Sequence, residues 1–285
     1  MKIFTYFMAG VYLVWCPVAV TAHEFWMLAQ PVSTAGLKAA NLSIQVGSYF
    51  EGELLPFTPA YIARLQQFSC GKALDITSLL RESAKTDPFQ IPLGCNGTHL
   101  FALDSHSNLI TLPADKFTAY LHDEGLEDIV KLREDSATTT SPGRERYRRH
   151  IKALLQTASA PAGSPRTPAL LSRQTDQTLE IIFDGQSIAK ASDSTMRFRI
   201  LFEGKPLEQK LVKAWYRHSG QTLIIRARTD RNGNVNFNLP YSGPWMLSVV
   251  HMLASTGSEN VDWDSFWSSL TFNVITGRTP GLQPH

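Results

Sequence analysis

Alternating apolar and polar residues recur along the chain and predict short β-strands. The clearest case in the first half is residues 42–46, where Leu, Ile and Val alternate with Ser and Gln before Gly47 ends the run. Similar but less regular runs predict strands at 61–68, 99–103 and 108–112, of which the first also fits a short helix. The polar residues between the last two runs predict a hairpin that joins them.

The second half of the chain has a purely β pattern. Runs of alternating or continuous apolar residues predict strands at 179–181, 195–202, 211–216, 223–228, 234–239, 245–252 and 269–274. Residues 230–234 resemble a calcium loop, but the glycine is misplaced and no downstream glutamate follows. Asn232-Gly233 is therefore interpreted as a hairpin turn. Several short strands with turns between them are typical of a β-sandwich.

Two segments have the helical spacing of apolar residues. After Pro113, residues Phe117, Tyr120 and Leu121 share one face of a predicted helix that ends near Gly125. Residues 141–156 predict a second helix, with apolar residues on one side and five arginines and lysines mostly on the other. This basic side suggests either an anionic partner or a solvated helix face, and we favour the solvated face because large apolar anchors are few.

The elements predict a mainly β, β-rich α+β chain. We expect a signal peptide at 1–22, followed by an N-terminal β-rich domain with one or two helices at 23–160. Residues 161–176 begin in a Pro-, Ala-, Gly- and Ser-rich stretch and are read as a linker. An immunoglobulin- or prealbumin-like β-sandwich at 177–276 and a tail at 277–285 complete the chain.

The N-terminus has the pattern of a secretory signal. Lys2 is followed by an apolar stretch, then by Pro17 and the short residues Val20-Thr21-Ala22, which predict cleavage after Ala22. A retained membrane anchor is the alternative, but the apolar run is at the lower limit for a span and Pro17 interrupts it. The sequence therefore predicts an exported, periplasmic protein without a transmembrane segment after cleavage.

Composition and cysteine content narrow the possible functions. A formal net charge of +2 argues against a nucleic-acid-binding protein, which would need a clearly basic surface. Three cysteines exclude a four-cysteine zinc site. Cleavage would leave Cys70 and Cys95, which in an oxidising compartment predict a disulfide, with two free buried thiols as the alternative.

Common catalytic motifs are absent from the sequence. The chain has no Gly-x-Ser-x-Gly elbow, no phosphate-binding glycine-rich loop, no dinucleotide-binding fingerprint and no His-Glu-x-x-His pair. These absences argue against the usual hydrolases, nucleotide-binding enzymes and zinc proteases.

The predicted cleavage makes His23 the first residue of the mature chain. Its freed α-amine and its imidazole would offer two nitrogen ligands, and a second imidazole would complete a brace suited to nickel or copper. His251, within an apolar run, is the candidate, although a core histidine is the alternative. Glu24, Asp262 and Asp264 are candidate partners of these histidines, and the two aspartates could instead cap the segment that follows.

An ordered set of motifs resembles a known family. The set is His23-Glu24-Phe25-Trp26, residues 116–126, Arg144–Lys152, Gly204-Lys205-Pro206-Leu207, Thr229-Asp230 with Gly233, Gly243-Pro244-Trp245 leading to His251-Met252, and Asp262–Trp267 before Leu270-Thr271-Phe272. It is similar to the bacterial exported proteins of the domain-of-unknown-function 4198 family. The resemblance implies a periplasmic protein associated with nickel or cobalt uptake, and no established enzyme activity. His23 and His251 fall on recurrent histidine positions of the family.

Three functional hypotheses follow. The first, which the resemblance favours, is a periplasmic protein that binds nickel, cobalt or possibly copper through His23 and His251 and passes it to a membrane uptake system. The second is a secreted oxidative enzyme with a copper brace, which would need an open coordination position. The third is a structural or interaction module without metal.

Overall fold

The computed structural model describes residues 23–34, 37–82, 85–157, 166–185, 195–257 and 260–274. The predicted signal peptide, the first part of the predicted linker and the predicted tail lie outside these residues.

The described chain is mainly β, as the sequence predicts. The strands of the first half are β1 (Glu24–Thr34), β2 (Leu37–Ser48), β3 (Glu51–Leu55), β4 (Ile62–Ser69), β5 (Lys72–Asp75), β6 (Phe89–Pro92), β7 (Thr98–Ser105), β8 (Asn108–Leu112) and β9 (Gly143–Gln156). Those of the second half are β10 (Leu179–Phe183), β11 (Met196–Phe202), β12 (Lys205–Pro206), β13 (Leu211–His218), β14 (Gln221–Arg228), β15 (Asn234–Phe237), β16 (Gly243–Ala254) and β17 (Trp263–Val274). The helices are α1 (Ala114–Asp123), α2 (Glu127–Asp135), α3 (Arg166–Leu171) and the short 3₁₀ turn η1 (Thr77–Leu79).

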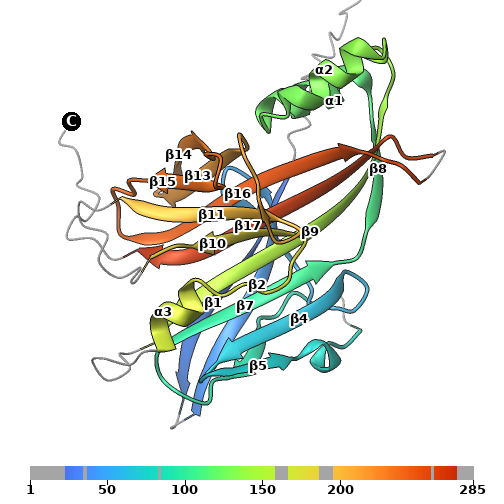
Figure 1. Ribbon diagram of the computed structural model, residues 1–285. Helices are drawn as coiled ribbons and strands as arrows, with labels where there is room; N and C mark the ends of the chain where they lie inside the picture. The colour runs from blue at the N-terminus through green and yellow to red at the C-terminus, as the bar shows by residue number, and fades with distance from the viewer. Residues whose placement is uncertain are drawn as a thin grey trace, which may run out of the picture.

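These strands form three sheets (Figure 1). The central sheet has the order β14-β13-β16-β17-β9-β7-β4-β5, with β8 also paired to β9. The N-terminal sheet consists of β1, β2, β3 and β6, and the C-terminal sheet of β10, β11, β12 and β15. The central sheet contains strands from both sides of the predicted domain boundary, which β9 and β17 join by parallel pairing.

The central sheet is covered on both faces, and side-chain alternation decides which core each residue enters. Along β16, Leu247 and Val249 enter the core shared with the C-terminal sheet. Val250 and Met252 instead point to the opposite face, where they pack against α1 and α2. The N-terminal sheet covers the same face as these helices, since Ser269 of β17 donates a hydrogen bond to the carbonyl of Phe25 in β1.

The predicted helix at 141–156 is wrong, because this segment is the 14-residue strand β9. Ile151, Ala153 and Leu155 face the core under the N-terminal sheet, while Leu154 faces the C-terminal sheet. Because both faces of β9 are covered, its apolar residues at 151 and 153–155 serve both cores without a period of two, and this spacing also fits a helix. The basic residues interpreted as a solvated helix face therefore lie along a strand.

Both predicted hairpins are also wrong. Strands β7 and β8 do not pair with each other, and each pairs with β9. Gly233 does adopt a left-handed turn with φ of 72°, but this turn leads from β14 in the central sheet to β15 in the C-terminal sheet. Local turn chemistry was read correctly, whereas the choice of pairing partner depends on the rest of the fold.

The predicted helix after Pro113 is confirmed as α1.

Among the described residues, no helix has the length and apolarity needed to cross a membrane.

Gly143 fixes the contact between α1 and the start of β9. A Cβ at this position would lie 2.3 Å from the Phe117 ring, which is fully buried and rigid. We expect Gly143→Ala to lower the free energy of unfolding by about 1–3 kcal/mol through overpacking. Chemical denaturation measures the change. Gly257→Ala is the control, since nothing lies within 4 Å of the added Cβ, and an equal effect of both changes would contradict the assignment.

Candidate functional site

His23 lies at the surface immediately before β1, and Glu24 turns into the protein. The His23 residue is exposed, whereas Glu24 is only 3% exposed. Ser248 of β16 donates a hydrogen bond of 3.0 Å to Glu24 Oε1, and Trp215 Nε1 donates one of 2.9 Å to Ser248 Oγ. The first residue of β1 is thus attached to the central sheet, so the backbone that carries His23 has a defined place at the surface.

A buried ionic cluster surrounds Glu24. We define this ionic cluster as the buried residues Glu24, Glu124 and Lys213 together with Asp123, whose side chain is 57% exposed. They come from β1, the end of α1 and β13. Lys213 Nζ donates hydrogen bonds of 2.8 Å to Glu124 Oε1 and 3.0 Å to Asp123 Oδ2. Glu124 and Lys213 are 3% and 2% exposed, so this pair is shielded from water. Two buried carboxylates thus face one buried ammonium, and a proton on one carboxyl would remove the excess negative charge.

The pKa values show where that proton resides. Burial raises the pKa of Glu124 to about 8, helped by the nearby charge of Glu24 and opposed by Lys213. Burial also raises the pKa of Glu24, against the attraction of Lys213. For Lys213, burial disfavours the charge, yet Glu124 and Glu24 together raise its pKa. These shifts favour the charged form of Lys213 and the protonated form of Glu124.

A third buried carboxylate lies on the same face of the central sheet. Glu145 of β9 accepts hydrogen bonds from the hydroxyls of Ser265 and Tyr120, and burial raises its pKa. Arg149 lies over the Phe25 ring at 4.7 Å and attracts both Glu145 and Glu24. The polar interior beneath α1 and β1 is thus an extended set of charges that includes Glu24, the residue after His23.

His251 lies on the other face of the central sheet. Its ring contacts Phe202 of β11 edge-on at 4.5 Å between centroids, and the residue is 7% exposed. Burial, and then the charge of Lys210, lower its pKa to about 4, so the ring is neutral at pH 7. Its Nδ1 has no hydrogen-bond partner within the described chain. These are the properties of a core histidine with one unused nitrogen.

The structure does not bring His23 and His251 together. Ser248, which bonds Glu24, and His251 are three residues apart on β16, and such residues point to opposite faces of a sheet. The sheet therefore separates the two histidines, and the predicted brace is not formed. No group of three His, Cys, Asp or Glu side chains placed to hold a metal ion occurs in the described ranges.

Asp262 and Asp264 bind arginines instead of histidines. Asp262 accepts hydrogen bonds from Arg144, the shortest of 2.6 Å, and Asp264 accepts a bidentate pair from Arg146 at 2.6 and 2.9 Å. These hydrogen bonds lower the pKa of both aspartates. The two pairs tie the start of β17 to β9, and neither carboxylate orients a predicted ligand.

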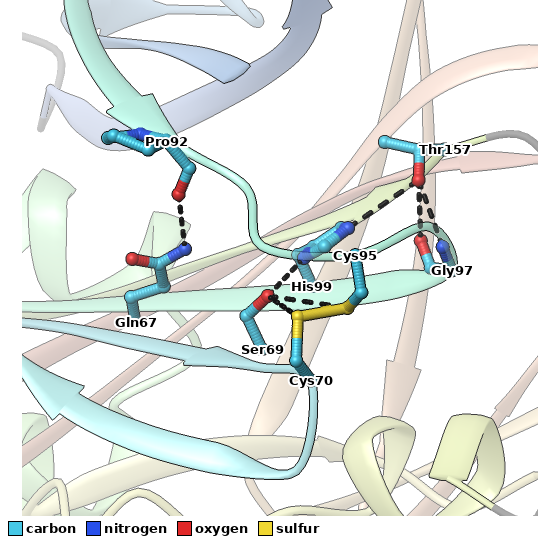
Figure 2. Close-up of a disulfide and its surroundings, with 8 residues drawn as sticks. All are labelled: Gln67, Ser69, Cys70, Pro92, Cys95, Gly97, His99 and Thr157. Carbon is cyan, nitrogen blue, oxygen red and sulfur yellow. Dashed lines mark hydrogen bonds between the residues drawn. A yellow bond between two sulfur atoms is a disulfide. The ribbon is translucent and has the colours of Figure 1, made fainter. Parts of the chain in front are cut away.

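The predicted disulfide is confirmed (Figure 2). Cys70, just after β4, is bonded to Cys95, just before β7, with the Cα atoms 5.8 Å apart. The bridge therefore closes the loop that contains β5, η1 and β6 at one end of the central sheet.

Sequence reasoning missed a Ser, His and Asp arrangement on the C-terminal-sheet side. Asp104 Oδ1 lies 2.8 Å from His150 Nδ1, and Ser268 is the cross-strand neighbour of His150. His150 Nε2 and Ser268 Oγ have no hydrogen-bond partner in the described chain, although both residues are at most 4% exposed. A substrate in solvent cannot reach them without displacement of the covering sheet, so the arrangement is a buried polar set and no hydrolase site.

The ionic cluster was also missed, because its members are far apart in the sequence. One signal was available: Lys213 interrupts the apolar run of β13, and a lysine in such a strand needs a buried carboxylate partner. The sequence does not identify which of the 25 acidic residues provides it.

The protonated Glu124 gives the fold a defined pH dependence. A carboxyl whose pKa is higher in the folded state binds more protons than in the unfolded chain, so its contribution destabilises the fold as pH rises from about 4.5 to about 8. We expect Glu124→Gln to flatten the fall in unfolding free energy over this range. Denaturant titrations at several pH values measure it, with exposed Glu134→Gln as the control. Parallel profiles for wild type and Glu124→Gln would contradict the protonated state.

Comparisons with known proteins give a family. No match to a curated protein was found. The model of the family described as a domain of unknown function, DUF4198, matches residues 20–253. This range includes every residue of the ionic cluster and strands β1 to β15. The chain belongs to the DUF4198 family.

Proposed function

We propose that this chain is an exported, periplasmic protein that binds a transition-metal ion, nickel or cobalt and possibly copper, and assists its uptake or delivery. The metal is cargo in this proposal. The observation that carries it is the exposed position of His23, held at the surface by the buried Glu24 beside it. The predicted processing after Ala22 would free the α-amine of the same residue.

The donor set suits such an ion. An α-amine with a pKa of about 7.7–8.0 and a neutral imidazole are nitrogen ligands of intermediate softness, which nickel, cobalt and copper accept. A bidentate site on one residue leaves several coordination positions for water, a small chelator or a partner's side chain. Incomplete coordination favours release, as a delivery protein requires.

His251 is outside the proposed site. It lies on the opposite face of the central sheet, against Phe202, so its unused Nδ1 cannot share a metal with His23 in this fold. The ligands that the protein would contribute are therefore the two nitrogens of His23 at the predicted mature N-terminus.

Calorimetric titration with nickel, cobalt and copper salts tests the proposal on a chain that begins at His23. We expect His23→Ala, or one extra residue before His23, to weaken binding at least about tenfold, because either change removes a nitrogen ligand. His251→Ala is the matched control and should leave the affinity within about twofold. Equal affinity in all three variants would overturn the N-terminal site, and no binding by the unmodified chain would overturn the metal function.

A further inference from the structure

The disulfide is connected to a buried histidine through one hydroxyl group (Figure 2). Ser69 Oγ lies 3.3 Å from Cys70 Sγ and 4.0 Å from Cys95 Sγ. The same oxygen lies 2.6 Å from His99 Nδ1. A purely structural disulfide requires none of these polar contacts, so their convergence on one sulfur pair needs an explanation.

The Ser69 hydroxyl and the His99 imidazole belong to buried residues, whereas both cysteine residues are partly exposed. Ser69 and His99 are 5% and 0% exposed. Cys70 and Cys95 are partly exposed, and Cys95 lies between the exposed residues Gly94 and Asn96. The bridge therefore lies at the boundary between solvent and core, with the hydrogen-bonding groups on its buried side.

The charge state of His99 limits the directions that these hydrogen bonds can take. Burial lowers its pKa, so the ring is neutral at physiological pH and only one nitrogen carries a proton. When that nitrogen is Nδ1, it donates to Ser69 Oγ, and the Ser69 hydroxyl is free to donate to Cys70 Sγ. The opposite nitrogen, Nε2, has only a long contact of 3.5 Å to Thr157 Oγ1.

We propose that Cys70–Cys95 is a reversible thiol–disulfide centre that exchanges with dithiols, and that Ser69 and His99 form a hydrogen-bond chain to the Cys70 sulfur. This inference is independent of the metal proposal. Ser69 and His99 are positioning residues in it, because they act on the sulfur without exchanging electrons.

The exchange balances with a dithiol as the reductant. Its thiolate attacks Cys95 Sγ, the bond between the two cysteine sulfurs breaks, and the electron pair leaves on Cys70 as a thiolate. The Ser69 hydroxyl donates to that thiolate, and His99 donates to Ser69 in turn. The second thiol of the dithiol then attacks the dithiol sulfur that is bonded to Cys95. The dithiol becomes an intramolecular disulfide and Cys95 is released, so two electrons and two protons pass to the cysteines.

The test is the rate of reduction of the folded chain by dithiothreitol, followed by alkylation of free thiols and mass measurement. We expect Ser69→Ala to slow reduction about tenfold, which corresponds to the loss of one hydrogen bond to a charged sulfur. Gln67→Met is the matched control, since Gln67 lies on the same strand and donates to the Pro92 carbonyl away from the bridge (Figure 2). It should react at the wild-type rate.

A second measurement does not depend on how the variant folds. The thiol of Cys70 in reduced wild-type protein should titrate below the ordinary cysteine value of about 8.5, as followed by the pH dependence of alkylation of the Cys70 peptide, which separates it from Cys95. Equal reduction rates of wild type and folded Ser69→Ala, an ordinary thiol titration, or reduction only at the rate of global unfolding would each overturn the proposal and leave a structural bridge.

Discussion

Two-sided burial of the central sheet is the constraint on which the other features depend. Strands β16, β17 and β9 lie in its middle, and each must place one set of side chains against the C-terminal sheet and the other against α1, α2 and β1. Because successive side chains of a strand point to opposite faces of the sheet, every side chain of these strands must enter one of the two cores. Ser248 therefore bonds Glu24 on one face, and His251 contacts Phe202 on the other. The backbone of the sheet thus lies between His251 and the segment that carries His23.

The same constraint produces the buried charges. Lys213 lies between apolar residues of β13, and its buried ammonium is stable there only when it is paired with carboxylates. Glu124 and Asp123, at the end of α1, are these partners. Glu24, the first residue of β1, interacts with Lys213 of this cluster through its charge. The ionic cluster is thus the link between the packing of α1 and the surface position of His23, which is the part of the molecule proposed to bind metal.

Sequence reasoning was sufficient for features with a local cause. Clean alternation at 42–46, the apolar face of α1 and the two cysteines of the predicted mature chain all led to correct predictions. It failed for β9, because burial on both faces removes the period that separates strand from helix, and for the hairpins, because a turn does not specify the partner strand. Two features join residues that are distant in the sequence, so no local pattern predicts them. They are the carboxyl pair of Glu24 and Glu124 and the hydrogen-bond chain of Ser69 and His99.

The central claim is that the metal proposed to bind this protein is held on one side of the sheet by His23 without His251. X-ray absorption spectroscopy of copper-loaded chain that begins at His23 tests it most directly, because multiple scattering from imidazole counts the histidines bound to the ion. The account predicts one imidazole per copper from the protein, unchanged in His251→Ala. Two imidazoles in the unmodified chain, falling to one in His251→Ala, would contradict it.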